Sequence, residues 1–194
     1  MHRERSSGAE AALDVGLDPV SAGKEYRDTL LGLLGDQDPT EVIQRVPDDA
    51  ETLVHQAGEH LRTRPEPSEW SVIELLGHMV DAELMVAGRL RWILAHEEPP
   101  LMAYDQDLLV ERLRHVDEDP NELLALWRAL IRSHVRLWNR TSEGDRARVG
   151  IHAERGPESF DITYRMLAGH GLLHIAQMRR TLEQIGHSAG ASPS

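Results

Sequence analysis

The chain has 194 residues, of which 40% are hydrophobic and 28% are charged, and this predicts one globular domain with a substantial core. Its 33 acidic residues exceed the 21 basic ones, and the net charge of -12 argues against nucleic acid or a membrane as a partner. The chain contains no cysteine, which excludes disulfides, zinc–thiolate sites, iron–sulfur clusters and cysteine nucleophiles.

The two ends of the chain differ in composition from its middle. Residues 1–22 are rich in Ala, Gly and Ser and predict a flexible leader, and residues 187–194 predict a flexible tail. The first ten residues lack the apolar core of a signal peptide, and no run approaches the ~18 apolar residues of a membrane span. We therefore expect a cytoplasmic protein with its folded domain at residues 23–186.

The first helical region, residues 24–62, carries several interruption signals. Gly35 is expected to end its first turns, and Asp38 followed by Pro39 has the sequence of a helix cap and a first helical residue. Pro47 is expected to interrupt the helix again, because proline lacks the backbone N–H that a helix interior uses. The region therefore predicts a broken helix.

The second helix is expected to begin near Ser71 and to end near His96. Ser71 and Glu74 have the spacing of a capping box, ahead of a long apolar run. Pro99 and Pro100 then stop the helix. A short helical piece is expected at residues 108–113.

Two further helices complete the predicted architecture. Asp119 and Pro120 begin a helix that extends to about residue 140, and the Gly/Pro-punctuated residues 148–160 predict a loop. The last helix is expected from Asp161 to about Ile185, with Gly186 as its C-terminal stop. No useful strand-like alternation is present, so the pattern predicts an all-α four-helix bundle.

His170 and His174 lie four residues apart on the last helix, so their rings project from one face. That face also carries apolar residues and should point inward, where unsatisfied imidazoles are costly. A helical His-x-x-x-His pair can bind one metal ion, with Gly169 and Gly171 leaving backbone room beside it. The alternative is two core histidines that each hydrogen bond to a neighbouring carbonyl or hydroxyl.

His78 lies midway along the second helix and supplies a third inward imidazole. Glu74 and Asp81 lie one turn on either side of it, and either could accept its free ring N–H and orient the ring. Alone, His78 is better explained as a boundary histidine paired with these acids. With the helical pair, three neutral imidazoles plus water would give an open site of the catalytic kind.

The other histidines receive different interpretations. His134 shares a stripe with two tryptophans and is expected to be a packing or hydrogen-bonding histidine. His152 follows Gly150 in the predicted loop, from which it could reach the mouth of the bundle. We expect the remaining ones to be surface residues: His2, His55, His60, His96, His115 and His187.

Two segments resemble the motifs of the DinB-like superfamily. Residues 70–83, WSVIELLGHMVDAE, are similar to the family's second-helix motif, and residues 168–178, AGHGLLHIAQM, to its final-helix His-x-x-x-His followed by Gln. The Gly-Ile-His-Ala segment that begins at Gly150 also fits. The resemblance covers about residues 26–185 and is specific because both motifs occur in the expected order.

The resemblance implies an up-down-down-up four-helix bundle of the DinB/YfiT-like type, often a homodimer. Carried over to this chain, the family's three metal ligands are His78, His170 and His174. The resemblance implies one divalent ion, nickel or zinc, with iron and manganese in some relatives. Three tryptophans on apparent helix faces are candidates for either the core or an interface: Trp92, Trp127 and Trp138.

The preferred functional hypothesis is a metal-dependent enzyme that acts on a small molecule. The resemblance includes thiol-dependent transferases, isomerases and hydrolases, and we favour transfer of a low-molecular-weight thiol in detoxification, with hydrolysis as the close variant. A metal-binding bundle without turnover and a plain interaction bundle are the alternatives. Candidate acid/base groups are Asp81, Glu83 and His152; Arg89 and Arg91 are candidates to meet an anionic co-substrate, although solvated surface arginines are commoner.

Overall fold

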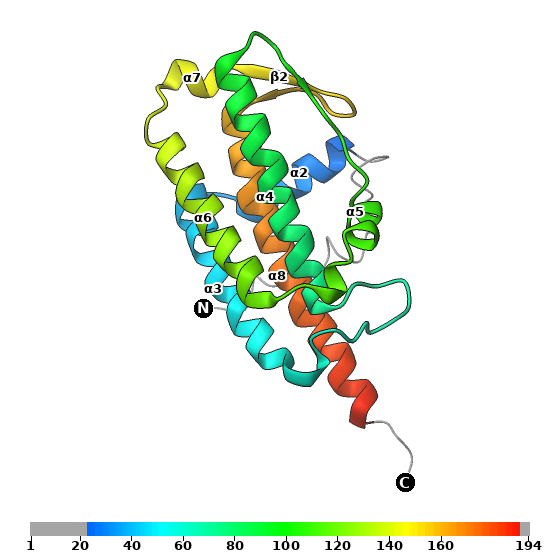
Figure 1. Ribbon diagram of the computed structural model, residues 1–194. Coiled ribbons are helices and arrows are strands. Elements are labelled where there is room, and N and C mark those ends of the chain that lie inside the picture. The colour runs from blue at the N-terminus through cyan, green and yellow to red at the C-terminus, as the bar shows by residue number, and fades with distance from the viewer. Residues whose placement is uncertain (1–22, 191–194) are drawn as a thin grey trace.

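The computed structural model describes residues 23–190, with side chains up to residue 186. Four long helices form a bundle (Figure 1): α3 (Pro39–Ala57), α4 (Val72–Ala95), α6 (Pro120–Trp138) and α8 (Phe160–Gly190). Helices α8 and α6 each pack against both α3 and α4. Helices α4 and α6 run in the same direction, opposite to α3 and α8 (Figure 1), which is the all-α up-down-down-up arrangement that the motif resemblance implies.

Shorter elements surround the bundle. Helix α2 packs against α8, and a long crossover that carries β1, α5 and η2 joins the parallel helices α4 and α6. The remaining short elements lie before α4 or between α6 and α8. Their bounds are α2 (Gly23–Leu34), η1 (Gly58–His60), β1 (Pro100–Leu101), α5 (Gln106–Arg112), η2 (His115–Asp117), α7 (Glu143–Ala147), β2 (Val149–His152) and β3 (Gly156–Ser159).

The predicted helix starts are confirmed by their caps. The Asp38 side chain accepts hydrogen bonds from the backbone N–H groups of Thr40 and Glu41, at the start of α3. Ser71 and Glu74 form a reciprocal capping box at the start of α4. Such caps satisfy N–H groups that have no partner within the helix, and so they fix where each helix begins.

Two expected helix boundaries are wrong. Pro47 lies buried inside the continuous helix α3, where packing against the bundle compensates for the one lost hydrogen bond. Helix α8 continues through Gly186 to Gly190, and Gly186 lacks the positive φ of a C-terminal glycine stop. The expected leader (1–22) and the last four residues of the expected tail (187–194) lie outside the described residues.

The expected loop at residues 148–160 instead contains two of the three strands of a small sheet. Strand β2 pairs in parallel with β1 and antiparallel with β3. Because no strand exceeds four residues, the sequence has no alternating pattern long enough to predict them. The sheet closes one end of the bundle (Figure 1), and it places His152 at the end of β2.

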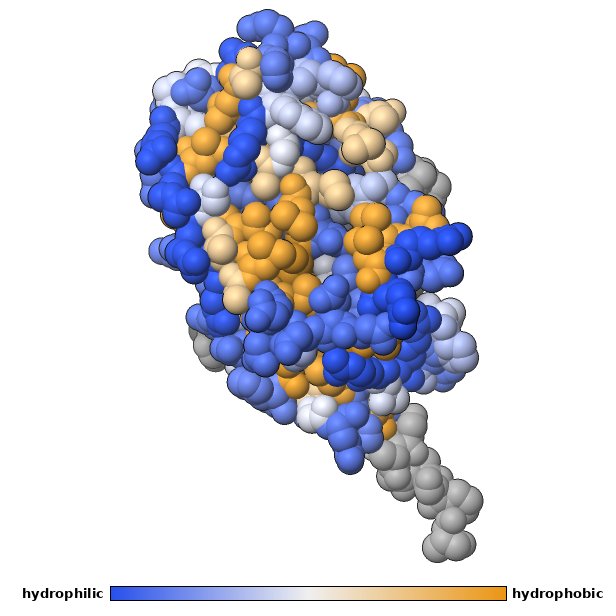
Figure 2. Space-filling model, in the orientation of Figure 1, coloured by the Kyte–Doolittle hydropathy of each residue, from blue (hydrophilic) through white to orange (hydrophobic). Residues whose placement is uncertain are grey.

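The tryptophans divide between core and surface. Trp127 is 1% exposed, and Trp138 stacks on Tyr164 with 4.2 Å between the ring centroids. Trp92 is 45% exposed. Figure 2 shows an apolar patch in the middle of the face where α4 and α6 lie, and both helices carry an exposed leucine, Leu84 and Leu126.

Within residues 23–190, no helix combines the length and apolarity that crossing a membrane requires.

Candidate metal centre

Three histidines from two helices converge inside the bundle. His170 and His174 lie one turn apart on α8, and His78 lies on α4, which packs against α8. The Nε2 atom of His78 lies 3.2 Å from the Nε2 atoms of both His170 and His174, and the latter two are 3.0 Å apart. His78 is 2% exposed and His174 is 6% exposed. The structure therefore brings the three candidate ligands to one point.

The three imidazoles are in the protonation state that binds a metal cation. Burial is the main cause that lowers the pKa of His174 to about 4. Burial, together with repulsion from neighbouring histidines, lowers the pKa of His78 and His170 well below 6.5. The three rings are therefore neutral at neutral pH, and a neutral imidazole nitrogen is the form that binds metals.

The spacing of the three Nε2 atoms also fits one ion. Nitrogen ligands about 2.0–2.1 Å from a shared ion lie between about 2.8 Å (adjacent octahedral positions) and about 3.4 Å (tetrahedral positions) from one another. The observed separations of 3.0–3.2 Å fall in this range. No fourth His, Asp or Glu of the described region joins the group. The residues thus fit a metal held by three protein ligands.

Gln177 orients one of these ligands. Its Oε1 lies 2.8 Å from Nδ1 of His174 and accepts the ring N–H there. A ring protonated at Nδ1 presents its lone pair at Nε2, which is the nitrogen that faces the other two histidines. Gln177 was not among the expected site residues, although its position one turn after His174 is a signal for this role.

The expected partners of His78 are wrong. Glu74 accepts hydrogen bonds from Ser71 and from the Arg64 guanidinium, because a glutamate at the third helical position is held by its capping box. Asp81 Oδ2 lies 2.7 Å from Nε2 of His115. His78 instead packs its ring against Trp70, with 4.9 Å between the centroids.

His115 was expected on the surface but is only 3% exposed. The crossover brings η2 back against α4 at Gly77, where a Cβ atom would lie 2.4 Å from the His115 ring. A glycine is therefore needed for this ring to reach Asp81. The contact joins residues 34 positions apart, which a local pattern does not predict.

A second buried polar group lies between α4 and α6. Glu83 accepts a hydrogen bond from the indole N–H of Trp127 at 3.0 Å, and its other oxygen lies 2.9 Å from Nδ1 of His134. His134 is fully buried and takes no part in the three-histidine cluster. Of the two expected roles, packing or hydrogen bonding, the structure supports packing, because neither ring nitrogen of His134 has hydrogen-bond geometry to a partner. Glu83 lies away from the cluster, beside His134 and Trp127.

A pocket opens beside the cluster and shares His170 with it. It is partly open to solvent, and both polar and apolar side chains line it. Apolar side chains such as Leu30, Val86 and Met166 line one part of it. Of the three candidate acid/base residues, His152 alone lines it, and of the two candidate arginines, Arg89 lines it.

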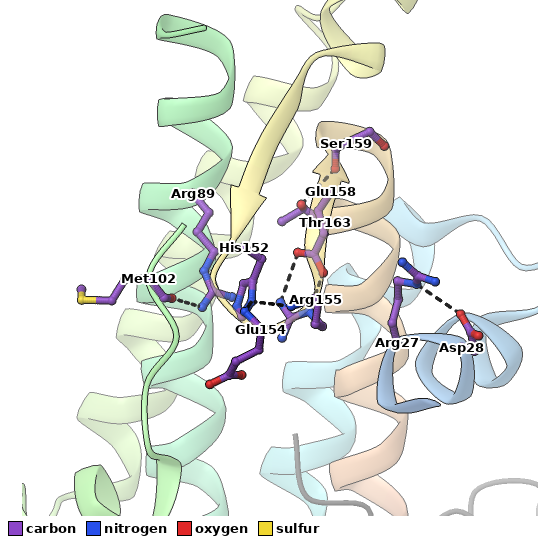
Figure 3. A network of polar contacts seen from close by, with 10 residues as sticks. All are labelled: Arg27, Asp28, Arg89, Met102, His152, Glu154, Arg155, Glu158, Ser159 and Thr163. Atoms are coloured by element: carbon purple, nitrogen blue, oxygen red, sulfur yellow. Dashed lines mark hydrogen bonds and ion pairs between the residues drawn. The ribbon is translucent and has the colours of Figure 1, made fainter. Parts of the chain in front are cut away.

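The second candidate arginine, Arg91, lies elsewhere. It is exposed and hydrogen bonds to the Ser133 hydroxyl on α6. Arg89, by contrast, is 8% exposed and reaches from α4 toward His152 and Met102 (Figure 3). The two residues are two positions apart on one helix, so they face different sides, and the surface interpretation holds for Arg91 only.

Fold and site together define a four-helix bundle with three inward histidines beside a pocket. The chain belongs to the DinB superfamily, whose sequence profile matches residues 27–178. No curated protein matches the chain.

A solved structure of YfiT from Bacillus subtilis has the same fold, with a TM-score of 0.71 and 21% sequence identity, over 76% of this chain and 86% of that chain. YfiT is described as a probable metal-dependent hydrolase with an unusual four-helix bundle topology. At this level of identity the likeness establishes the shared fold.

Proposed function

We propose that this protein is a metal-dependent enzyme acting on a small molecule, with His78, His170 and His174 as the ligands of one divalent ion. The observation that carries the proposal is the convergence of three Nε2 atoms, two of them from buried histidines, within 3.2 Å of one another at the wall of a pocket. Imidazole ligands suit zinc and nickel, and also iron. Membership of the superfamily adds manganese to the candidates.

The ligand set supports a catalytic site over a purely structural one. Structural zinc sites are closed by four protein ligands, whereas catalytic sites keep a position open. Here three histidines converge without a fourth His, Asp or Glu of the described region. When bound, a divalent ion acts as a Lewis acid and favours deprotonation of a thiol or water.

The chain's own residues position the reactants and exclude water. Gln177 holds the His174 ring, and the apolar side chains of the pocket lower the local dielectric constant. Asp81 and Glu83 do not line the pocket, and His152 uses Nδ1 to accept backbone N–H groups. His152 is therefore a hydrogen-bond donor at Nε2, and we assign it no role as a base.

We favour a thiol as the nucleophile because these residues provide no general base. A thiol has a pKa of about 8.5 and ionises far more readily than water, whose pKa is about 15.7. The thiol would release its proton to solvent water, and the thiolate would attack an electrophilic carbon of the second substrate and form a carbon–sulfur bond, while the leaving group departs with the electron pair. Hydrolysis is the second candidate, supported by the description of YfiT as a probable metal-dependent hydrolase.

A conjugation assay tests this proposal. Protein reconstituted separately with zinc and nickel is incubated with glutathione, bacillithiol or mycothiol and an electrophile such as 1-chloro-2,4-dinitrobenzene. We expect conjugate formation that requires the metal and is lost in His170→Ala. Hydrolysis of nitrophenyl esters without any conjugation would favour the second candidate. No turnover of either kind would contradict an enzymatic role for the site.

A further inference from the structure

Arg89 is a buried cation that has no carboxylate partner within the described part of the chain. Its side chain is 8% exposed, and its Nη2 donates to the backbone carbonyl of Met102. The guanidinium also lies over the Tyr104 ring, 5.7 Å from the centroid. These two contacts use part of its donor capacity, because a guanidinium has five N–H groups.

The buried charges around Arg89 do not balance. Arg155, 9% exposed, lies in the same pocket and pairs with Glu158, which is 1% exposed. Two guanidinium groups thus face one buried carboxylate, and the remaining acid of the pocket wall, Glu154, is exposed. Burial, reinforced by the positive charge of Arg155, lowers the pKa of Arg89. An anion in the pocket would relieve this repulsion.

His152 adds an unused donor beside this charge. Its Nδ1 accepts the backbone N–H groups of Glu154 at 3.2 Å and Arg155 at 3.4 Å, so the ring proton resides on Nε2. That Nε2 is buried and has no hydrogen-bond partner. A buried donor without a partner is costly and marks a place where a ligand acceptor fits. Figure 3 shows His152 between the side chains of Arg89 and Arg155.

We propose that Arg89 and His152 form an anion subsite that binds a carboxylate of the substrate and directs the rest of the molecule toward His170. A planar carboxylate can accept two guanidinium N–H groups in parallel and a third hydrogen bond from the imidazole. A single negative charge also balances the one uncompensated guanidinium, whereas a phosphate dianion would exceed it. The anion subsite extends the proposed function. It rests on that function in one respect, namely that the bound carboxylate belongs to a substrate of the enzyme.

The test is a binding titration with hexanoate and with hexanamide, its uncharged counterpart of similar shape. The full-length protein is titrated as purified and again after chelation, and binding is followed by NMR of its ¹⁵N-labelled histidine rings. We expect hexanoate to bind about 10-fold or more tightly than hexanamide, with a shift of the His152 Nε2–H resonance. Arg89→Gln should abolish this preference, and His152→Gln should reduce it several-fold.

Arg91→Gln is the matched control, because it removes an exposed guanidinium two residues away on the same helix and should leave the preference unchanged. Circular dichroism establishes that each variant is folded. Equal binding of acid and amide to the wild type, or a preference that persists in folded Arg89→Gln, would overturn the subsite. A preference that disappears on chelation would also overturn it, since the carboxylate would then bind the ion. Failure of the conjugation and ester assays would leave this titration unaffected.

Discussion

The side-chain oxygen of Gln177 lies 2.8 Å from Nδ1 of His174, three residues earlier on the same helix. This contact fixes which ring nitrogen carries the proton, and it leaves Nε2 free to face His78 and His170. The orientation of the candidate ligand set therefore depends on a residue that does not touch the point where the three Nε2 atoms meet.

Replacing Gln177 should weaken metal binding without removing a ligand. We expect Gln177→Ala to lower the affinity for zinc by about 10–100-fold, because the His174 ring loses the acceptor that holds its tautomer. Competition against a chromophoric chelator measures this change. Gln56→Ala, an exposed substitution on α3, is the control and should match the wild type. An unchanged affinity in Gln177→Ala would show that the contact does not orient the ligand.

The close approach of Gly169 to α2 predicts a steric effect on stability. A Cβ at Gly169 would lie 2.1 Å from the carbonyl oxygen of Leu30, so α2 must move away from α8. We expect Gly169→Ala to lower the free energy of unfolding by about 1–3 kcal/mol or more. Gly88→Ala is the matched control, because nothing lies within 4 Å of its Cβ, and it should add about 0.5–1 kcal/mol. Urea denaturation of both variants measures the difference, and equal stabilities would contradict the predicted clash.

The buried contact between Glu83 and His134 should matter more for stability than an exposed ion pair. His134→Ala removes a fully buried ring and leaves the Glu83 carboxylate with Trp127 alone, at an expected cost of about 3–5 kcal/mol. Arg128→Ala breaks contacts with Asp48 and Glu51 at the surface and should cost about 1 kcal/mol or less. Thermal and urea unfolding compare the two. A small effect of His134→Ala would mean that Glu83 finds another partner.

The three clustered histidines predict the pH dependence of the metal-free protein. Their pKa values are lowered in the folded state, to about 4 for His174, and in the unfolded chain they titrate near their usual value of 6.5. The unfolded state therefore binds more protons below about pH 6.5, so the free energy of unfolding should fall as the pH is lowered toward about 4. Above about pH 6.5 these groups should contribute no pH dependence.

Urea denaturation in the presence of a chelator, at a series of pH values, tests this expectation. His174→Phe removes one of the titrating groups, so the variant should show a shallower fall in stability than the wild type. A wild-type free energy of unfolding that stays constant between about pH 7 and about pH 5 would contradict the neutral, buried state of the cluster.

The sequence predicted those features that depend on local patterns. The caps at Asp38, Ser71 and Asp119 appear as expected because a helix start is encoded within a few residues. The convergence of the three histidines was also predictable, since the spacing of His170 and His174 places both on one face of α8. The position of His78 midway along the second helix added a third inward imidazole, and the family motif then identified all three as metal ligands.

Features that depend on distant contacts were missed. The burial of His115 requires the crossover to fold back on Gly77, and strand β1 pairs with β2 across about 50 residues of chain. Arg89 was indistinguishable from a surface arginine in the sequence, because its burial depends on the crossover and on the strand that carries His152. Each of these contacts joins segments whose proximity is set by the tertiary fold.

Elemental analysis measures whether His78, His170 and His174 hold a metal ion. The protein is purified without an affinity tag, as wild type and as His174→Ala, and metal content is measured before and after reconstitution. We expect about one equivalent of a divalent metal per wild-type chain and a large loss in the folded variant. A wild type that binds no metal even after reconstitution, or a His174→Ala variant that retains the full equivalent, would contradict it.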